Sequence, residues 1–249
     1  MRVIFFGTAA FAVPSLEHLL ARGHTVELCV TQPDRPKGRG LKPEPSPVKR
    51  AALQFGLTLA QPERLHAGLV QGRRQPDVGV VAAYGCLIGR ELLQWPTDGL
   101  LGVHPSLLPR YRGAAPVAWA LLEGATRTGV TIFRLNERLD AGDIAAQREV
   151  TIEPGDDAQT LTARLAQLGA EELIRILEAI ETGGATWRPQ DESQVSLSPK
   201  LTKAQGRIDW SQPAEVIARL VRAVVPWPGA TAQWQGRPVK IWSVSADPS

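Results

Sequence analysis

Residues 102–116 read Gly-Val-His-Pro-Ser-Leu-Leu-Pro-Arg-Tyr-Arg-Gly-Ala-Ala-Pro, and they indicate how the chain folds. A strand-like run, 98–103, overlaps the start of this stretch and delivers His104 to the carboxyl end of the strand, before a turn rich in proline and glycine. A second strand-like run, 129–135, leads into Leu-Asp-Ala-Gly-Asp, which contains Asp140. Because open parallel sheets bind ligands at the carboxyl ends of their strands, we predict that His104 and Asp140 form an acid/base pair at neighbouring strand ends.

Both residues also have a purely structural interpretation. A single histidine at a strand end is commonly part of the packing, and an aspartate in Asp-Ala-Gly is a common turn former. Histidine is also the side chain best suited to moving protons near neutral pH. Periodicity alone does not decide between the two interpretations.

The first thirty residues predict a parallel α/β sheet. An apolar strand, 2–7, ends at a glycine, an amphipathic helix follows over 11–22, and a second strand covers 25–31. Strand, helix and strand in this order are typical of a parallel sheet. The first turn carries a lone glycine rather than Gly-x-Gly-x-x-Gly, so we predict no NAD. A continuous apolar run, 78–84, suits a central strand buried on both faces.

Further elements extend this pattern until the composition changes after residue 183. The predicted helices are 48–55, 115–122 and 156–181, and the predicted strands are 130–135 and 144–152. We therefore predict an α/β domain over 1–183 with a Rossmann-like, doubly wound and mostly parallel sheet, then a polar linker over 184–206. A β segment is predicted over 207–249, with a helix-like stretch at 214–224 and a hairpin at 231–244.

The composition argues against a membrane protein and against a metal site. The chain has 249 residues, of which 43% are hydrophobic, but no apolar run approaches the roughly 20 residues that cross a bilayer. The apolar N-terminal strand is too short for a signal peptide, so we predict a cytoplasmic protein. The two cysteines, Cys29 and Cys86, and the four histidines show no ligand spacing, so we predict no metal.

One segment combines proline, glycine and positive charge. Residues 32–47 hold five prolines and two glycines, which excludes a helix or an interior strand and predicts a long irregular loop. The loop carries Arg35, Lys37, Arg39 and Lys42, and the sequence pI is about 9.1. Such a basic patch suits a polyanion, although a solvated surface loop would have the same composition.

Several motifs together resemble one known family, the formyltransferases that use 10-formyltetrahydrofolate, and among them the enzymes that formylate methionyl-tRNA. That family carries Asn-x-His, then Ser-Leu-Leu-Pro-x-x-Arg-Gly, then Leu-Asp-x-Gly-Asp. This chain has the histidine, the Ser-Leu-Leu-Pro and the aspartate, but Gly102 stands where the family has asparagine. The stretches 32–40, 199–203, 206–210 and 225–230 resemble the same family.

The resemblance implies a function, a co-substrate and a partner. The implied reaction transfers a formyl group from 10-formyltetrahydrofolate to the amino group of methionyl-initiator tRNA for translation initiation, carried out by a monomer without a metal. The implied catalytic residues are His104 and Asp140, with position 102 contacting the oxyanion. The implied folate-binding residues are Ser106, Leu107, Leu108, Pro109, Tyr84, Gly85, Cys86, Leu87 and Ile88. The implied tRNA-binding residues are Arg35, Lys37, Arg39 and Lys42.

The resemblance also implies that the C-terminal segment begins an OB-like barrel. Such a barrel needs about five strands, and this chain ends after about two. We therefore expect a truncated OB-like segment over 207–249, and we expect that segment to be marginally stable because isolated hairpins are marginal in water.

Two other functions remain open from the sequence. The chain could formylate another amine, such as an amino sugar or a peptide precursor, or it could be a catalytically impaired relative that binds folate or tRNA. Gly102 favours the second alternative, since losing one oxyanion donor costs on the order of 10²–10³ in rate. If the site otherwise keeps the geometry of the family, Gly102→Asn should raise turnover.

Overall fold

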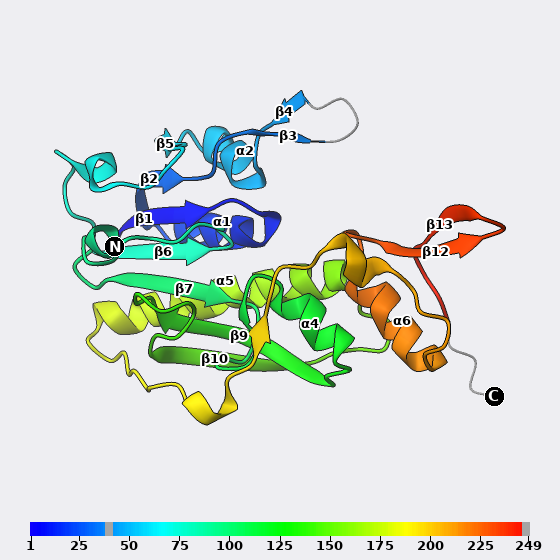
Figure 1. The fold of residues 1–249 in the computed structure, drawn as a ribbon. Coiled ribbons are helices and arrows are strands. Elements are labelled where there is room, and N and C mark those ends of the chain that lie inside the picture. Colours follow the sequence, from blue (N-terminus) through cyan, green and yellow to red (C-terminus); the bar gives the residue numbers. More distant parts are fainter. Residues whose placement is uncertain (38–41, 246–249) are drawn as a thin grey trace.

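A computed structural model describes residues 1–37 and 42–245 of the chain. Within them, seven strands form one central sheet in the order β10-β9-β7-β6-β1-β2-β5 (Figure 1). These strands are β1 (Arg2–Gly7), β2 (Thr25–Val30), β5 (Leu59–Ala60), β6 (Val78–Ala82), β7 (Leu100–His104), β9 (Arg127–Arg134) and β10 (Ile144–Thr151). Five neighbours, from β7 to β5, run parallel, which confirms the mostly parallel α/β sheet.

The sheet is covered on both faces, which explains why β1 is apolar from Val3 to Phe6. Successive side chains of a strand point to opposite faces. Val3 and Phe5 therefore pack in one core with the helices α1, α2, α4 and α5, whereas Ile4 and Phe6 pack in another with α3 and a short 3₁₀ helix. The helices are α1 (Val13–Ala21), α2 (Pro47–Gln54), α3 (Arg90–Leu93), α4 (Pro116–Leu122) and α5 (Ala158–Glu181), and the 3₁₀ helix is Ala67–Val70.

The long helix α5 begins at a capping box. The carboxylate of Asp157 accepts hydrogen bonds from the backbone N–H groups of Gln159 and Thr160, and the Thr160 hydroxyl accepts from the backbone N–H of Asp157. These contacts pair backbone donors that the first turn of a helix otherwise leaves free. The predicted helix start at 156 is therefore confirmed to within two residues.

The direction of β9 corrects one expectation about the two candidate catalytic residues. β9 runs antiparallel to β7, with Leu101 opposite Arg134 and His104 opposite Thr131. The carboxyl end of β9 consequently lies beside the amino end of β7, so His104 and Asp140 do not follow neighbouring strand ends at one edge. Asp140 reaches His104 because the chain between β9 and β10 turns back towards it.

The proline-rich segment is more regular than expected. It forms a small antiparallel hairpin of its own, β3 (Arg35–Lys37) and β4 (Lys42–Glu44), instead of an irregular loop. Pro36 lies opposite Pro43. Prolines are tolerated because this two-stranded ribbon has only edge strands. The described residues of the segment before Pro47, where a helix begins, form neither a helix nor an interior strand.

Residues 187–198 run along the sheet domain and are called the strap below. At one end, Arg188 and Ile144 exchange both backbone hydrogen bonds, and the Trp187 ring stacks on the Arg134 guanidinium at 4.1 Å. At the other end, β11 (Leu197–Ser198) pairs in parallel with β8 (Arg112–Gly113), directly after the Ser-Leu-Leu-Pro turn.

A short module follows the strap. Its helix α6 (Ala214–Ala223) packs on α4, and its hairpin comprises β12 (Ala230–Trp234) and β13 (Arg237–Ile241). Buried apolar residues join the module to α4, including Val221, Val224 and Ala118. The predicted helix and hairpin are both present, and Figure 1 shows them in orange and red, with α6 beside α4. Among the residues that the structure describes, no helix is both long and apolar enough to span a membrane.

Candidate active site

His104 ends β7 and is held by one hydrogen bond. Its side chain is buried, and Nε2 lies 2.9 Å from the main-chain oxygen of Tyr111. A carbonyl oxygen can only accept, so Nε2 carries the hydrogen and donates. In the neutral ring the lone pair therefore sits on Nδ1, the nitrogen that faces Asp140.

The carboxylate of Asp140 completes the predicted pair. Its Oδ2 lies 3.8 Å from Nδ1 of His104, beyond the 2.7–3.2 Å of a direct hydrogen bond. Oδ2 also accepts a 2.8 Å hydrogen bond from the backbone N–H of Gly113, which fixes where the carboxylate points. A proton gained at Nδ1 would face this negative charge, so the arrangement suits a histidine that accepts and releases a proton.

The turn that carries Asp140 has a demanding backbone. Asp140 adopts φ +49°, in the left-handed region that aspartate tolerates better than most residues. Gly142 packs so closely on the main-chain oxygen of Arg134 that a Cβ atom there would overlap it. The Asp-Ala-Gly sequence is thus the local reason that the chain can return from β9 towards His104.

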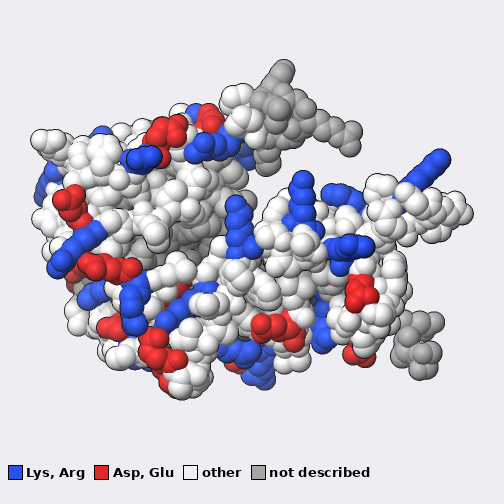
Figure 2. Space-filling model, in the orientation of Figure 1, with Lys and Arg blue, Asp and Glu red and all other residues white. Residues whose placement is uncertain are grey.

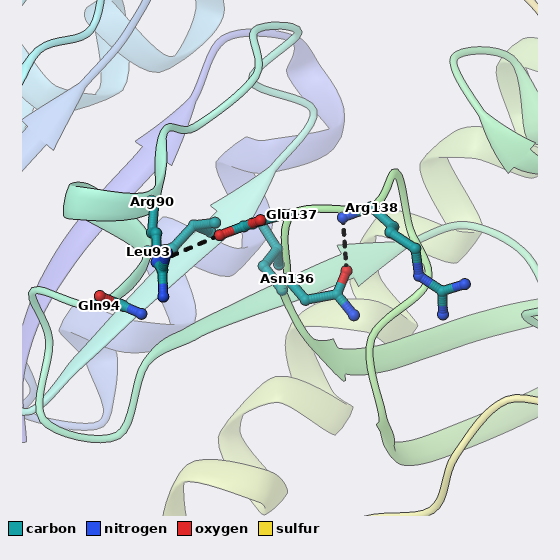
Figure 3. Close-up of a pocket in the computed structure, with 7 residues that line it drawn as sticks. Arg90, Leu93, Gln94, Asn136, Glu137 and Arg138 are labelled. Atoms are coloured by element: carbon teal, nitrogen blue, oxygen red, sulfur yellow. Dashed lines mark hydrogen bonds and ion pairs between the residues drawn. The ribbon is translucent and has the colours of Figure 1, made fainter.

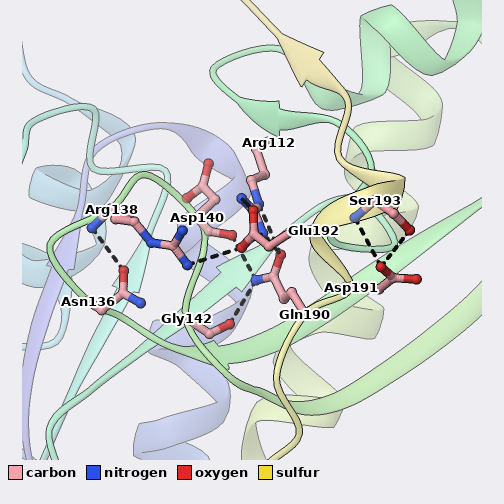
Figure 4. Close-up of polar contacts among 9 residues, drawn as sticks. All are labelled: Arg112, Asn136, Arg138, Asp140, Gly142, Gln190, Asp191, Glu192 and Ser193. Atoms are coloured by element: carbon pink, nitrogen blue, oxygen red, sulfur yellow. Dashed lines mark hydrogen bonds and ion pairs between the residues drawn. The ribbon is translucent and has the colours of Figure 1, made fainter.

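Three side chains outside the predicted set hold this turn (Figure 4). The buried amide of Gln190, in the strap, donates to the main-chain oxygens of Asp140 and Gly142 at 2.8 and 2.7 Å. The amide oxygen of Gln190 accepts two hydrogen bonds from the buried Arg112 guanidinium, which also pairs with Glu192 at 3.2 Å. Sequence reasoning missed Gln190 and Glu192, because a polar stretch without periodicity resembles a solvated linker; Arg112 lies in the Ser-Leu-Leu-Pro-x-x-Arg-Gly motif, but the sequence does not show its contact with them.

Gly102 lies on β7 opposite Phe133 of β9. A Cβ atom on residue 102 would lie 2.6 Å from Cζ of Phe133 and 2.8 Å from Cδ1 of Leu135, and closer still to Cε1 of Phe133. The same ring meets the His104 imidazole edge to face, with centroids 6.4 Å apart. The space that a side chain at position 102 would need is therefore filled by Phe133, which is buried.

The turn after β6 is anchored at one main-chain oxygen, and the tip of the turn is exposed. The main-chain oxygen of Tyr84 accepts hydrogen bonds from Thr8 Oγ1 and Gln32 Nε2, at 2.9 and 2.7 Å. Burial raises the pKa of Tyr84 to about 12, so its hydroxyl stays protonated at neutral pH. Beyond it, Gly85 and Cys86 are exposed, Leu87 is 82% exposed, and Ile88 is half-buried.

The Ser-Leu-Leu-Pro turn points much of its side-chain surface into the protein. The fully buried Ser106 donates its hydroxyl to the main-chain oxygen of Arg110 at 2.6 Å, and Leu108 packs with Phe133 and Ile144. Pro109 is also buried, and Leu107 is half-buried. These side chains shape the turn that carries the Tyr111 carbonyl to His104.

A cavity of about 390 Å³ lies between the segment after the Tyr84 turn and the chain after β9 (Figure 3). Its lining residues are Arg90, Leu93, Gln94, Leu135, Asn136, Glu137 and Arg138. Nε of Arg90 lies 3.5 Å from Oε1 of Glu137, so an exposed ion pair joins the two walls. Exposed pairs of this kind contribute little stability, and a ligand could separate them at low cost.

The predicted tRNA-binding residues lie away from the His104–Asp140 pair along the chain. Arg35 is exposed, 3.8 Å from Glu63, and Lys37 pairs with Lys42 across the β3–β4 hairpin. Arg39 lies outside the described residues. Figure 2 shows Lys and Arg side chains around a hollow on this face, between the β3–β4 side and the C-terminal module. Among the described residues, no cluster of three or more potential ligands could hold a metal ion.

Comparisons with known proteins identify the family of the chain. The model of the formyl transferase family matches residues 1–177, and that of the formyl transferase C-terminal domain matches residues 200–249. The methionyl-tRNA formyltransferases of Solibacter usitatus and Chloroflexus aggregans are 45% and 48% identical to the chain. The matches cover 97% and 100% of this chain and 79% and 82% of those proteins.

Solved structures show the same fold at lower identity. An N-formyltransferase from Helicobacter canadensis, in complex with folinic acid and dTDP-3-aminofucose, superposes with a TM-score of 0.76 at 16% identity, over 97% of this chain and 86% of that one. HypX from Aquifex aeolicus, in complex with tetrahydrofolic acid, gives 0.73 at 21% identity, over 98% of this chain and 37% of that one.

The fold and the family match define the class as a formyl transferase, an enzyme with a mostly parallel sheet followed by a short C-terminal strand segment. Within that class the sequence match is far closer than the structural one. The chain belongs to the methionyl-tRNA formyltransferase family.

Proposed function

We propose that the chain transfers the formyl group of 10-formyltetrahydrofolate to the amino group of methionyl-initiator tRNA, in the cytoplasm and as a monomer. One observation carries the chemistry: Nε2 of His104 is tied to the Tyr111 carbonyl, which leaves Nδ1 facing the Asp140 carboxylate. The tRNA substrate is supported by relatives that are named methionyl-tRNA formyltransferase and are 45% and 48% identical over almost the whole chain.

The reaction needs one proton to move. The amine nitrogen bonds to the formyl carbon, the bond from that carbon to N10 breaks, and the proton lost by the amine ends on N10. Nδ1 of His104 takes up and returns this proton, and Asp140 stabilises the imidazolium that exists in between. A positioned base of this kind contributes about 10²–10⁴-fold to a rate.

Position 102 supplies no side-chain donor to the oxyanion. The Phe133 ring fills the adjacent volume, so no other side chain takes the place of an amide there. Stabilisation of the oxyanion then falls to the protonated His104 and to main-chain groups. We expect turnover below that of relatives with asparagine, by on the order of 10²–10³-fold.

Reduced folate is proposed to bind between the Tyr84 turn and the chain after β9. The 390 Å³ cavity there has the size of a small-molecule pocket, and its walls mix apolar and polar side chains. The exposed Leu87 offers apolar surface to the pterin ring. Ser106 to Pro109 contribute by shaping the neighbouring turn, with backbone groups available to the ligand.

The basic residues of the hairpin segment are proposed to contact tRNA. Arg35 is exposed and free to reorient, because its partner Glu63 is equally exposed at 3.8 Å. Arg39 and the paired Lys37 and Lys42 extend the charge along the same segment. Positive charge of this kind supplies salt-dependent affinity for phosphates.

One assay tests the proposal. The chain is incubated with 10-formyltetrahydrofolate and methionyl-initiator tRNA, and formylmethionine is measured after release from the tRNA. Formation of the product supports the proposal. Gly102 favours a second candidate, a relative that binds folate and tRNA without turnover, and this is the conclusion if tetrahydrofolate and tRNA both bind while no product forms.

A further inference from the structure

We propose that Gln190 and Arg112 are positioning residues, which hold Asp140 in place relative to His104. The strap, which carries Gln190, therefore contributes to the active site. The proposal rests on the proposed function, because it assigns a role to residues around the proposed catalytic pair. Its evidence is a network of hydrogen bonds between the strap and that pair.

The amide of Gln190 makes all the contacts that it can. Its NH₂ group donates to the main-chain oxygens of Asp140 and Gly142, at 2.8 and 2.7 Å, so both sides of the turn are held. Its oxygen accepts from Nε and Nη2 of Arg112, at 3.0 and 2.7 Å. A buried amide with every hydrogen bond satisfied has one orientation only, because any rotation leaves polar atoms unpaired.

Arg112 links this amide to the carboxylate itself. Its guanidinium is buried and is balanced by Glu192, from the strap, at 3.2 Å. The next residue, Gly113, donates its backbone N–H to Oδ2 of Asp140. One short strand, β8, therefore orients Gln190 with one residue and the catalytic carboxylate with the next.

The strap also reaches the histidine side of the pair. The hydroxyl of the fully buried Ser198 donates to the main-chain oxygen of Tyr111 at 2.9 Å. That oxygen is the acceptor for Nε2 of His104, also at 2.9 Å. The strap consequently contacts the main-chain groups that place both members of the pair, at Asp140 through Gln190 and at Tyr111 through Ser198.

The placement of Asp140 matters because Asp140 and His104 lie close together but do not form a direct hydrogen bond. Nδ1 of His104 and Oδ2 of Asp140 lie 3.8 Å apart, and the turn between β9 and β10 holds Asp140 at φ +49°. Without the two donors of Gln190, the turn loses its hydrogen bonds to the strap at the main-chain oxygens of Asp140 and Gly142. A displacement of about 1 Å in a catalytic group can cost on the order of 10²-fold in rate.

Gln190→Glu separates positioning from simple support. A glutamate still accepts from Arg112 but has no hydrogens to donate to Asp140 and Gly142. We expect kcat to fall by on the order of 10²-fold, with both KM values little changed, because the lost contacts place the catalytic pair and do not bind substrate. Gln194→Glu is the control, since it makes the same change on the same strap at an exposed residue whose side chain contacts Asp191.

A spectroscopic measurement keeps the test independent of activity. The ¹⁵N signals of the His104 imidazole are recorded in folded protein without substrates. We expect Q190E to change them in the same sense as Asp140→Asn does, and Q194E to leave them as in wild type. If wild type forms no product, the proposed function fails, and these spectra still decide the positioning role.

The outcomes separate clearly. A loss of kcat with unchanged KM values, together with altered His104 signals in Q190E alone, supports the proposal. Unchanged His104 signals in folded Q190E overturn it, as does an equal effect of Q194E. Should Q190E not fold, Arg112→Lys replaces it: this variant keeps a positive charge beside Glu192 but loses the paired donors to the Gln190 amide, and unchanged kcat with unchanged His104 signals then overturns the proposal.

Discussion

The tip of the Phe133 ring occupies the space that a side chain on Gly102 would need. The two residues are cross-strand partners on β9 and β7, and the same ring packs edge to face against the histidine of the site. The small residue and the large one therefore fit each other. This pairing changes what a substitution at position 102 can be expected to do.

Gly102→Asn alone is expected to destabilise the protein and to bring no gain in turnover. The new side chain must displace Phe133, and overpacking of this kind costs about 1–3 kcal/mol. The expectation drawn from the sequence, that the single substitution would raise turnover, assumed room for the new side chain, and here Phe133 occupies that room. Urea unfolding and steady-state kinetics measure both effects.

The double variant Gly102→Asn with Phe133→Leu should be more stable than Gly102→Asn alone and should have a higher turnover. Leucine lacks the outer ring atoms of Phe133 that crowd position 102 most closely, so the amide gains room once the flexible end of Leu135 also shifts. We expect kcat to rise above that of Phe133→Leu alone, with KM little changed, because an oxyanion donor acts mainly on the transition state. A single Gly102→Asn variant as stable as wild type would contradict the packing argument.

His104→Ala should remove turnover, and Asp140→Asn should reduce it. The alanine variant has no group to move the proton, which costs about 10²–10⁴-fold. Asparagine keeps an oxygen for the Gly113 N–H but loses the charge beside Nδ1, so we expect the smaller loss in kcat. Folate binding, followed by titration calorimetry, should persist in both. The exposed His66→Ala is the control, and equal losses in all three variants would argue against the assignment.

Arg35→Ala and Arg39→Ala should weaken the use of tRNA and leave folate affinity unchanged. Each removes a positive charge from the segment, so KM for tRNA should rise and its dependence on salt should become shallower. The matched control is Arg74→Ala. This exposed arginine precedes β6, at the edge of the sheet opposite its carboxyl end. A change in folate affinity with normal use of tRNA would assign the segment to folate instead.

His24 should make the stability of the protein depend on pH just below neutrality. Burial, and then the nearby amino terminus 3.2 Å from Nδ1, lower the pKa of His24 in the folded state below its usual 6.5. The unfolded chain then binds the proton more readily, so the stabilisation is complete above pH 6.5 and declines as the pH falls towards the folded-state pKa.

His24→Gln should flatten this dependence. Thermal unfolding midpoints are compared between pH 7.5 and pH 5.5 for wild type and the variant, with His66→Ala as a control for an exposed histidine. A wild-type midpoint that does not fall more steeply than that of His24→Gln over this range would show that His24 is not the group responsible.

Much of the sheet could be predicted from sequence because its signals are local. The apolar run of β1 alternates between two buried faces, and α5 begins at a capping aspartate, Asp157. The antiparallel direction of β9 could not be predicted in this way, since an apolar strand reads alike in both directions. The β3–β4 hairpin was missed because its prolines argue against strands, a rule that applies to interior strands more than to an isolated ribbon.

The sequence indicates the candidate site only where motifs mark it. His104 and Asp140 follow recognisable patterns, and the structure brings them together. Gln190 lies 50 residues from Asp140 in a polar stretch, and only the folded chain shows that its amide is buried. The fit between Gly102 and Phe133 also joins distant positions. The sequence signal for this fit is an unexpected glycine on one strand together with a bulky residue opposite it on the neighbouring strand.

The position of the strap in the chain has a consequence for biosynthesis. A nascent polypeptide that has left the ribosome as far as residue 183 already contains all seven strands of the central sheet. It lacks the amide donors of Gln190 and the hydroxyl of Ser198. The sheet can therefore form before the strap reaches the Asp140 turn, and, with the positioning role proposed above, we expect such a nascent chain to become active only after residues 187–198 have emerged.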